Sequence, residues 1–406
     1  MKKETLFLYL FLFGYAGLKA QKPQTINMEQ AMELAQHNNY SLRASYQQIE
    51  AARGNLRSNF FLPQPQIGIQ YSEIPPHESP GKSQEKSVYI QQDLSFPLRY
   101  PLQTRSLKSQ VKAAELNYKQ AELSIKVQTR NAYLEWLGSV SLLQLAEENL
   151  KIAQEFLSSS QALYDAGEIG AIPLSRAKLS VSQATMQGNT AKNTEIRKRT
   201  ELLTLMSMPN ETILQPTDSL TQFALFRSIS FSYDSLQQPT LLYSNALAKQ
   251  ARFELAFQRS GYLPDLSFRY SWQRIDGVSG YYGLSFGVKI PIWFFSQQGS
   301  IQKSKAAYRQ NLENYRQSKL AYDNQLKAYQ QSIPQYESNI NEYKEMMEES
   351  LSMIQYSKDA YKAGELDYLK YLDAQQTYIQ TKAIYINTIV NYQIALTDVF
   401  KITGGF

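Results

Sequence analysis

Residues 266–273 read Leu266-Ser267-Phe268-Arg269-Tyr270-Ser271-Trp272-Gln273, and the chain alternates again in Tyr282-Gly283-Leu284-Ser285-Phe286-Gly287-Val288. In both stretches every second residue is apolar or aromatic, and the residues between are charged, small or polar. Successive side chains of a β-strand point to opposite faces, so the pattern predicts a hairpin, assigned to 264–294, with one apolar and one polar face. A similar alternation earlier in the chain predicts a hairpin over 64–98.

The whole chain reads as two copies of one unit. Leu62-Pro63 recurs as Leu263-Pro264, Pro97 recurs as Pro291, and Tyr164-Asp165-Ala166-Gly167-Glu168 recurs as Tyr361-Lys362-Ala363-Gly364-Glu365. These landmarks keep their order, which favours duplication over chance recurrence. The first repeat is assigned to residues 21–208 and the second to 240–406, and the proline-containing segment 209–239 is expected to be an irregular belt between them.

Long helices are expected on both sides of each hairpin. Apolar residues step alternately by four and three from Leu107 to Ile125, and again from Tyr308 with one polar member, which is the heptad spacing of a coiled coil. The predicted helices cover 27–61, 102–163, 174–208, 240–262, 297–361 and 368–403. At about 1.5 Å per residue, the two longest would extend on the order of 90 Å. The expected fold is α+β, mostly α and elongated, with tight turns near 164–173 and 361–368.

The composition limits the classes of function. The chain of 406 residues has no Cys and two His, so a disulfide framework or a thiolate site is excluded. His37 and His77 are isolated, and neither a metal site nor a cofactor is expected. The short basic run 197–199 lacks aromatic neighbours, so nucleic acid is not an expected partner. No nucleophile elbow, phosphate loop or zinc-protease helix is present, and the chain is not expected to be an enzyme.

Residues 1–20 predict a secretory signal peptide. Lys2 and Lys3 precede an apolar run that ends at Leu18, and Ala20 is a small residue suited to cleavage. This run is shorter than the about 20 apolar residues that a membrane-spanning helix needs. We therefore expect secretion rather than a retained helical anchor.

The apolar faces of the hairpins must be covered, because a two-stranded ribbon of this kind is not stable alone in water. Packing into a soluble sandwich would need further strands, whereas long helices flank each hairpin. Strands of outer-membrane barrels alternate apolar and polar residues in this way and carry aromatic girdles. The predicted lipid-facing aromatic belt consists of Tyr71, Tyr270, Trp272, Tyr282 and Trp293.

Four strands cannot close a barrel, since open edges in hydrocarbon would leave backbone groups unsatisfied. Two chains would give eight strands around an interior filled by side chains, whereas three chains give twelve strands that can enclose a lumen. A homotrimer is therefore the smallest assembly that forms a pore. Two other hypotheses are a secreted coiled-coil scaffold or adhesin and a periplasmic adaptor, which has a single helical hairpin.

Together, these features resemble one family over essentially the whole mature length. The helix–hairpin–helix plan is duplicated, Leu-Pro enters the first strand of each copy, Ile290-Pro291-Ile292 follows the fourth strand, and Leu369-Lys370-Tyr371-Leu372-Asp373-Ala374-Gln375 follows the second Ala-Gly-Glu turn. The chain thus resembles the TolC-type outer-membrane efflux factors. The resemblance implies a homotrimer with a twelve-stranded barrel in the outer membrane of a Gram-negative bacterium and a periplasmic helical tunnel. Its partners would be a periplasmic adaptor and an inner-membrane pump, of RND type. The stretch 275–280, through Gly287 and Ile290-Pro291, also resembles the CzcC and CusC branch, which works with heavy-metal pumps.

The resemblance also implies functional sites. The adaptor would dock at the tips formed by Gly167, Glu168, Gly364 and Glu365. In the family, aspartates one helical turn apart near the second tip constrict the pore. Here Asp373 occupies one such place, Lys370 stands at the other, and Asp367 is a candidate substitute. A ring of like acidic charges favours cations. The expected function is a passive exit duct without a catalytic residue.

Overall fold

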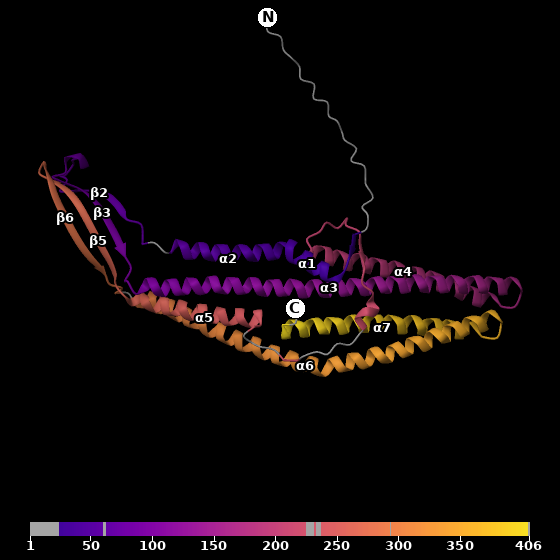
Figure 1. The fold of residues 1–406 in the computed structure, drawn as a ribbon. Helices are drawn as coiled ribbons and strands as arrows, with labels where there is room; N and C mark the ends of the chain where they lie inside the picture. The colour runs from indigo at the N-terminus through magenta and orange to yellow at the C-terminus, as the bar shows by residue number, and fades with distance from the viewer. Residues whose placement is uncertain (1–23, 60–61, 225–230, 233–236, 293, 405–406) are drawn as a thin grey trace, which may run out of the picture.

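The computed structural model describes residues 24–59, 62–224, 231–232, 237–292 and 294–404. The predicted signal peptide at 1–20 lies outside these residues. The chain forms an elongated rod, with a curved sheet at one end and helices that run away from it (Figure 1).

The sheet contains four strands, two from each repeat. They are β2 (Gln66–Ser72), β3 (Glu85–Leu94), β5 (Asp265–Ile275) and β6 (Val278–Lys289). All neighbours are antiparallel in the order β2-β3-β5-β6, so the two repeats pair through β3 and β5. Asp276 and Gly277 join β5 to β6 with φ values of 46° and 83°. Two positive φ values in a two-residue loop are the signature of a type I′ turn, which matches the twist of a hairpin.

Seven helices form the rod in the described part of the chain. They are α1 (Met28–Asn38), α2 (Tyr40–Ser58), α3 (Arg99–Asp165), α4 (Ala171–Leu205), α5 (Pro239–Arg259), α6 (Phe294–Lys362) and α7 (Tyr368–Thr403). α2 and α4 lie one after the other along α3, and α5 and α7 do so between α3 and α6 (Figure 1). With 67 and 69 residues, α3 and α6 each extend about 100 Å. The predicted fold class, mostly helical with four strands in two repeats, is confirmed.

The first predicted helix is in fact two helices. Asn39 is extended (φ −61°, ψ 121°), and its Oδ1 accepts the N–H groups of Ser41 and Leu42 at 2.9 and 3.2 Å. Its Nδ2 donates to the carbonyl of Leu205 at 2.8 Å. Asn39 therefore caps the start of α2 and ties it to the end of α4, which explains why one helix ends and another begins there.

The largest hydrophobic core lies halfway along the rod. Short parallel strands β1 (Gln24–Ile26) and β4 (Leu214–Pro216) pack there with α1, α3, α4 and α7. Tyr133 and Trp136 on α3 are fully buried, and the Trp136 Nε1–H donates to Glu195 Oε1 at 2.9 Å. Short 3₁₀ turns at Pro80–Lys82, Leu220–Ala224 and Ser260–Tyr262 complete the elements. This core holds the two repeats together at their middle.

α6 continues through Pro334. Proline has no N–H to donate and commonly bends a helix without ending it. Figure 1 shows α6 bent part-way along its length, so that it closes on α7 at the far end of the rod.

Candidate functional site: a two-faced sheet and a helical tip

One face of the sheet is apolar and uncovered within the chain. The register places one row of apolar side chains across all four strands: Ile69, Val88, Trp272 and Tyr282. Trp272 is 56% exposed and Phe286, on the same face, is 79% exposed. A contiguous exposed apolar surface marks a place where a protein or a membrane packs.

The predicted aromatic belt falls on this face as far as the structure describes it. Tyr270 meets Trp272 edge to face, with ring centroids 4.5 Å apart, and stacks with Tyr282 at 6.4 Å. Tyr71 lies in the next row, beside Lys86, whose Nζ is 5.3 Å from the ring centroid. Trp293 lies outside the described residues.

The opposite face is polar. Four side chains at its centre contact one another and are here called the Arg269 cluster: Gln70, Tyr89, Gln91 and Arg269. Nε and Nη2 of Arg269 donate to Gln91 Oε1 at 2.9 and 2.7 Å. The Arg269 guanidinium carbon lies 4.2 Å from the centroid of the Tyr89 ring. The sheet thus separates apolar from polar side chains across its thickness, as the alternation of the sequence predicts.

The two helical hairpins end in turns of the same geometry. Gly167 and Gly364 have φ of 77° and 73°, and each donates its N–H to the carbonyl three residues before it, at 3.0 and 3.1 Å. The next residue, Glu168 or Glu365, donates to the carbonyl five residues before it, at 2.9 Å. This is the Schellman motif, whose left-handed residue favours glycine. All four predicted tip residues are exposed, and the two turns lie at the same end of the rod (Figure 1).

The three predicted gate residues lie on one face of α7 next to the second tip. Asp367 is the N-cap residue, and its side chain makes no capping hydrogen bond. Asp367, Lys370 and Asp373 follow at intervals of three along the helix, and all three are exposed. Residues three apart on a helix are neighbours, so the three charges form one short stripe.

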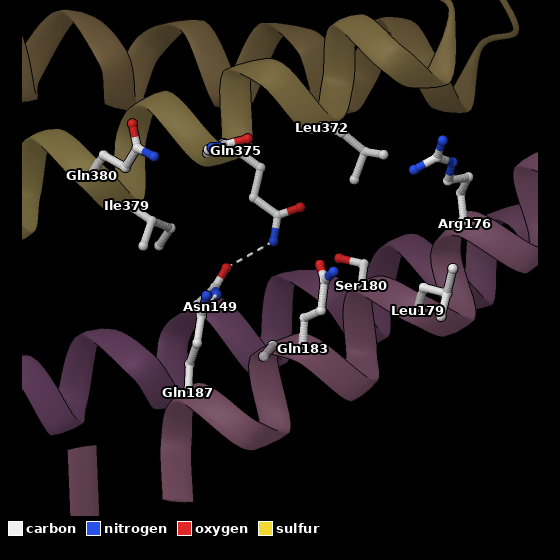
Figure 2. A pocket seen from close by; sticks show the side chains of 12 residues that line it. Asn149, Arg176, Leu179, Ser180, Gln183, Gln187, Leu372, Gln375, Ile379 and Gln380 are labelled. Carbon is white, nitrogen blue, oxygen red and sulfur yellow. Dashed lines mark hydrogen bonds between the residues drawn. The ribbon is translucent and has the colours of Figure 1, made fainter. Parts of the chain in front are cut away.

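A groove lined by amide side chains runs between α4 and α7 above α3, with a volume of 360 Å³. Figure 2 shows Gln375 reaching across it from α7 to Asn149 on α3. Gln375 Nε2 donates to Asn149 Oδ1 at 2.8 Å, and Asn149 Nδ2 donates to Gln187 Oε1 at 2.9 Å. Gln375 Oε1 is buried and finds no hydrogen-bond partner in the described part of the chain. An unpaired buried acceptor is costly, so a donor from outside the chain would be stabilised here.

Two polar links tie the second hairpin to α3 near the tip. Lys382 Nζ donates to Glu148 Oε2 at 2.6 Å and to the Tyr378 hydroxyl at 2.9 Å, and Tyr378 donates to Glu148 Oε1 at 2.7 Å. Burial lowers the pKa of Lys382, but the hydrogen bonds to Glu148 and Tyr378 outweigh it and the pKa is raised overall. On α6, Lys358 pairs with Glu155 of α3.

Two features are absent from the described residues: a helix that could cross a membrane and a group of side chains that could hold a metal ion. None of their helices combines the length and apolar character needed to cross a membrane. Nor do three of their His, Asp or Glu side chains gather closely enough to hold a metal ion.

The family model for outer membrane efflux proteins matches residues 31–207 and 235–405, which cover both repeats. The chain belongs to this family. No curated protein is significantly similar to it in sequence.

Solved structures share the fold of this efflux protein at low sequence identity. The CmeC outer membrane channel of Campylobacter jejuni is 18% identical with a TM-score of 0.79, over 93% of this chain and 85% of that chain. CusC is 15% identical with a TM-score of 0.77, over 93% and 92%. The outer membrane protein VceC of Vibrio cholerae is 14% identical with a TM-score of 0.75, over 92% and 96%.

Family membership decides between the hypotheses drawn from the sequence. It identifies an efflux channel of the outer membrane with a periplasmic helical extension, and it excludes the scaffold and the adaptor. The family and its fold are those of channels and not of enzymes. Proteins of this family form homotrimers and work with an adaptor and an inner-membrane pump.

Sequence reasoning missed three parts of this efflux protein: the Arg269 cluster, the amide groove and the link from Glu148 to Lys382. Each joins residues from different elements far apart in the chain. Only the alternation on β5, which puts Arg269 on the polar face, gave any signal in the sequence.

Proposed function

We propose that three copies of this chain form an exit duct of a tripartite efflux system, which passively conducts substrates from a pump and adaptor to the outside. This proposal rests on the four-stranded sheet, which has an exposed apolar face and a polar face. Its edge strands in the described part of the chain, β2 and β6, each pair with a neighbour on one side. Unpaired strand edges cannot stay open in hydrocarbon. Pairing β6 of one chain with β2 of the next satisfies both edges and closes twelve strands around the polar face.

Mass and conductance test this proposal together. The full chain would be expressed with its N-terminal segment in a Gram-negative host, extracted from the outer membrane with detergent and analysed by light scattering. A detergent-dependent particle of about three chain masses that conducts ions in a planar bilayer is the expected result. A monomer or dimer that stays in solution without detergent would contradict it.

We propose Asp367, Lys370 and Asp373 as the pore gate. Three chains would bring three copies of this charged stripe together where the tips converge. A carboxylate ring favours cations, while Lys370 opposes this effect. Asp373→Ala should therefore lower the cation preference of the duct, and Lys370→Ala should raise it, when both are measured as reversal potentials across a bilayer.

We propose that the adaptor docks at Gly167, Glu168, Gly364 and Glu365, and that the pump is of the RND type. The exposed glutamates favour an adaptor tip with basic side chains. The double variant Glu168→Lys, Glu365→Lys should retain less adaptor in a pull-down of the cross-linked complex. Glu342→Lys changes the same charge on α6 away from the tip and should retain the wild-type amount.

We propose that Tyr71, Tyr270, Trp272, Tyr282 and Trp293 form an aromatic belt against outer-membrane lipid. The exposure of Trp272 on the apolar face supports this placement. Lipids brominated in their acyl chains should quench the fluorescence of Trp272 and Trp293, whereas the buried Trp136 of the helical core should keep its emission in a variant with both Trp272→Phe and Trp293→Phe.

The finer proposal for the cargo is heavy-metal cations. It rests on the resemblance of residues 275–280 to the CzcC and CusC branch and on the acidic residues of the gate. Deleting the gene should then raise sensitivity to copper, silver, zinc or cobalt, and an unchanged tolerance to all four would contradict it.

A further inference from the structure

Arg269 carries a positive charge that no carboxylate of the described part of the chain neutralises. Its hydrogen-bond acceptors are amide oxygens, Gln91 Oε1 at 2.7 and 2.9 Å and Gln70 Oε1 at 3.5 Å. Lys289, on the same face of β6, is paired with Asp93 at 2.7 Å, and Arg99, at the start of α3, is paired with Asp265 of β5 at 3.0 Å. The Arg269 cluster is therefore a local excess of positive charge at the centre of the polar face.

The guanidinium is held in place from two sides. Tyr89 lies beneath it and crosses Gly68, where an added Cβ would come within 2.5 Å of the ring. Gln91 is itself oriented, because its Nε2 donates to Asp93 Oδ1 at 3.1 Å. A fixed guanidinium loses less conformational entropy when it binds a ligand than a free side chain does.

The strand next to Arg269 presents small residues on the polar face. Arg269 pairs in register with Ser285 on β6, and Gly283 and Gly287 are the next residues of β6 on the same face. Arginine has five N–H donors, of which three make the bonds given above. The two remaining donors, one on each terminal nitrogen, are of the kind that binds carboxylate and phosphate.

We propose that three Arg269 clusters form an anion-binding ring inside the barrel, and that the duct favours solutes carrying carboxylate, phosphate or other anionic groups. The proposal rests on the trimeric duct proposed above. Arg269 lies between the ends of β5 (Asp265–Ile275), so every solute would pass the ring. The ring would restrict the heavy-metal cargo proposed above to metal held in an anionic complex, because a bare metal cation would be repelled there.

Reversal potentials in a KCl gradient test the ring, with the purified full-length trimer in a planar bilayer. Arg269→Gln should lower the chloride-to-potassium permeability ratio by at least about fivefold at low salt, because one unit charge at about 4 Å in water has this effect on the anion alone. Arg269→Lys keeps the charge and should keep most of the ratio. The matched control Arg274→Gln removes an exposed arginine from the same strand but from the apolar face, and should leave the ratio unchanged.

These outcomes distinguish a failure of the anion-binding ring from a failure of the proposed duct. A wild type that forms no conducting trimer contradicts the proposed function itself. A conducting trimer whose ratio is the same in Arg269→Gln, or falls equally in Arg269→Lys, overturns the ring. If Arg269→Gln does not assemble, the wild type decides: its ratio should decline from 0.01 M to 1 M KCl, where the Debye length falls from about 30 to about 3 Å. A ratio independent of salt would overturn the ring.

Discussion

The two tip turns share a sequence motif and a backbone, yet the same tyrosine has opposite surroundings in them. Tyr361 is 4% exposed and its repeat counterpart, Tyr164, is 42% exposed. The Tyr361 ring lies 5.2 Å from Phe156 and 5.6 Å from Tyr371, and its hydroxyl shares a hydrogen bond of 2.8 Å with Ser160.

The difference follows from the helix that each turn introduces. α7 lies between α3 and α6 and buries its inner side chains, whereas α4 lies along α3 and exposes Ile172, Leu179 and Met186. The duplication therefore copied the course of the backbone but not the environment of the side chains. Tyr361 at the second turn packs into the chain's own helical bundle, whereas Tyr164 at the first turn is exposed on the surface of the chain.

The largest effect is expected from truncating the two tyrosines. Tyr361→Ala should cost about 3 kcal/mol of local stability, because it removes a buried aromatic ring, and Tyr164→Ala less than about 0.5 kcal/mol. Amide hydrogen exchange at the start of α7 in the purified trimer should then rise about a hundredfold in the first variant only. Equal acceleration at both turns would mean that another chain covers Tyr164 in the assembled protein.

The glycines of the same turns should behave alike, which separates backbone from side-chain effects. Gly167 and Gly364 have nearly equal positive φ values, and an added Cβ would meet no atom within 4 Å at either. Alanine at each should cost about 1–2 kcal/mol through backbone strain alone. Gly188→Ala, in the middle of α4 with equally open space, should be neutral or stabilise by up to about 1 kcal/mol. Amide exchange rates measure the cost of each variant, at the two tips for Gly167→Ala and Gly364→Ala and in the middle of α4 for Gly188→Ala. Unequal costs at the two turns would contradict their shared geometry.

The sequence predicts the course of the backbone at both tip turns well, because both turns repeat one motif and heptads define the helices on either side. It does not predict which tyrosine is buried. That depends on α7 packing against both α3 and α6, a contact between repeats that neither local periodicity nor spacing reveals. The break at Asn39 had a usable signal in the side chain itself, since asparagine is a preferred N-cap residue.

The candidate sites also differ in whether local sequence predicts them. Strand alternation assigned the faces of the sheet, and hence the apolar aromatic residues, from local sequence. The Arg269 cluster needs the register of β2, β3 and β5 across both repeats, so no stretch of sequence contains it. The amide groove likewise combines α3, α4 and α7.

A smaller effect is expected from the ion pair between Glu148 of α3 and Lys382 of α7. Glu148→Gln should cost about 1 kcal/mol, because it leaves the partly buried Lys382 without its carboxylate. If this link keeps the tip closed, the variant should open more often in single-channel recordings. Glu147→Gln neutralises the exposed neighbouring residue and serves as the control. An open probability unchanged from the wild type would show that the link stabilises the fold without restraining the gate.

The smallest effect should come from pH acting on Glu155. The hydrogen bond from Lys358 lowers the pKa of Glu155, and Lys151 and Lys362 add to it against the opposing effect of burial. The folded pKa is thus below the ordinary value of 4.5, so the link to α6 contributes above that value and is lost as the pH falls through the folded pKa. Both side chains are more than a third exposed, which limits the contribution to less than about 1 kcal/mol.

Hydrogen exchange at the second tip between pH 7 and the acid range measures this contribution, after correction for the intrinsic pH dependence of exchange. The wild type should lose protection on acidification, and Glu155→Gln should already be less protected at pH 7 and change less. All other titratable groups are present in both proteins, so the difference between the two curves belongs to Glu155. Parallel curves would mean that the ion pair between α3 and α6 adds nothing to the tighter packing of the second tip.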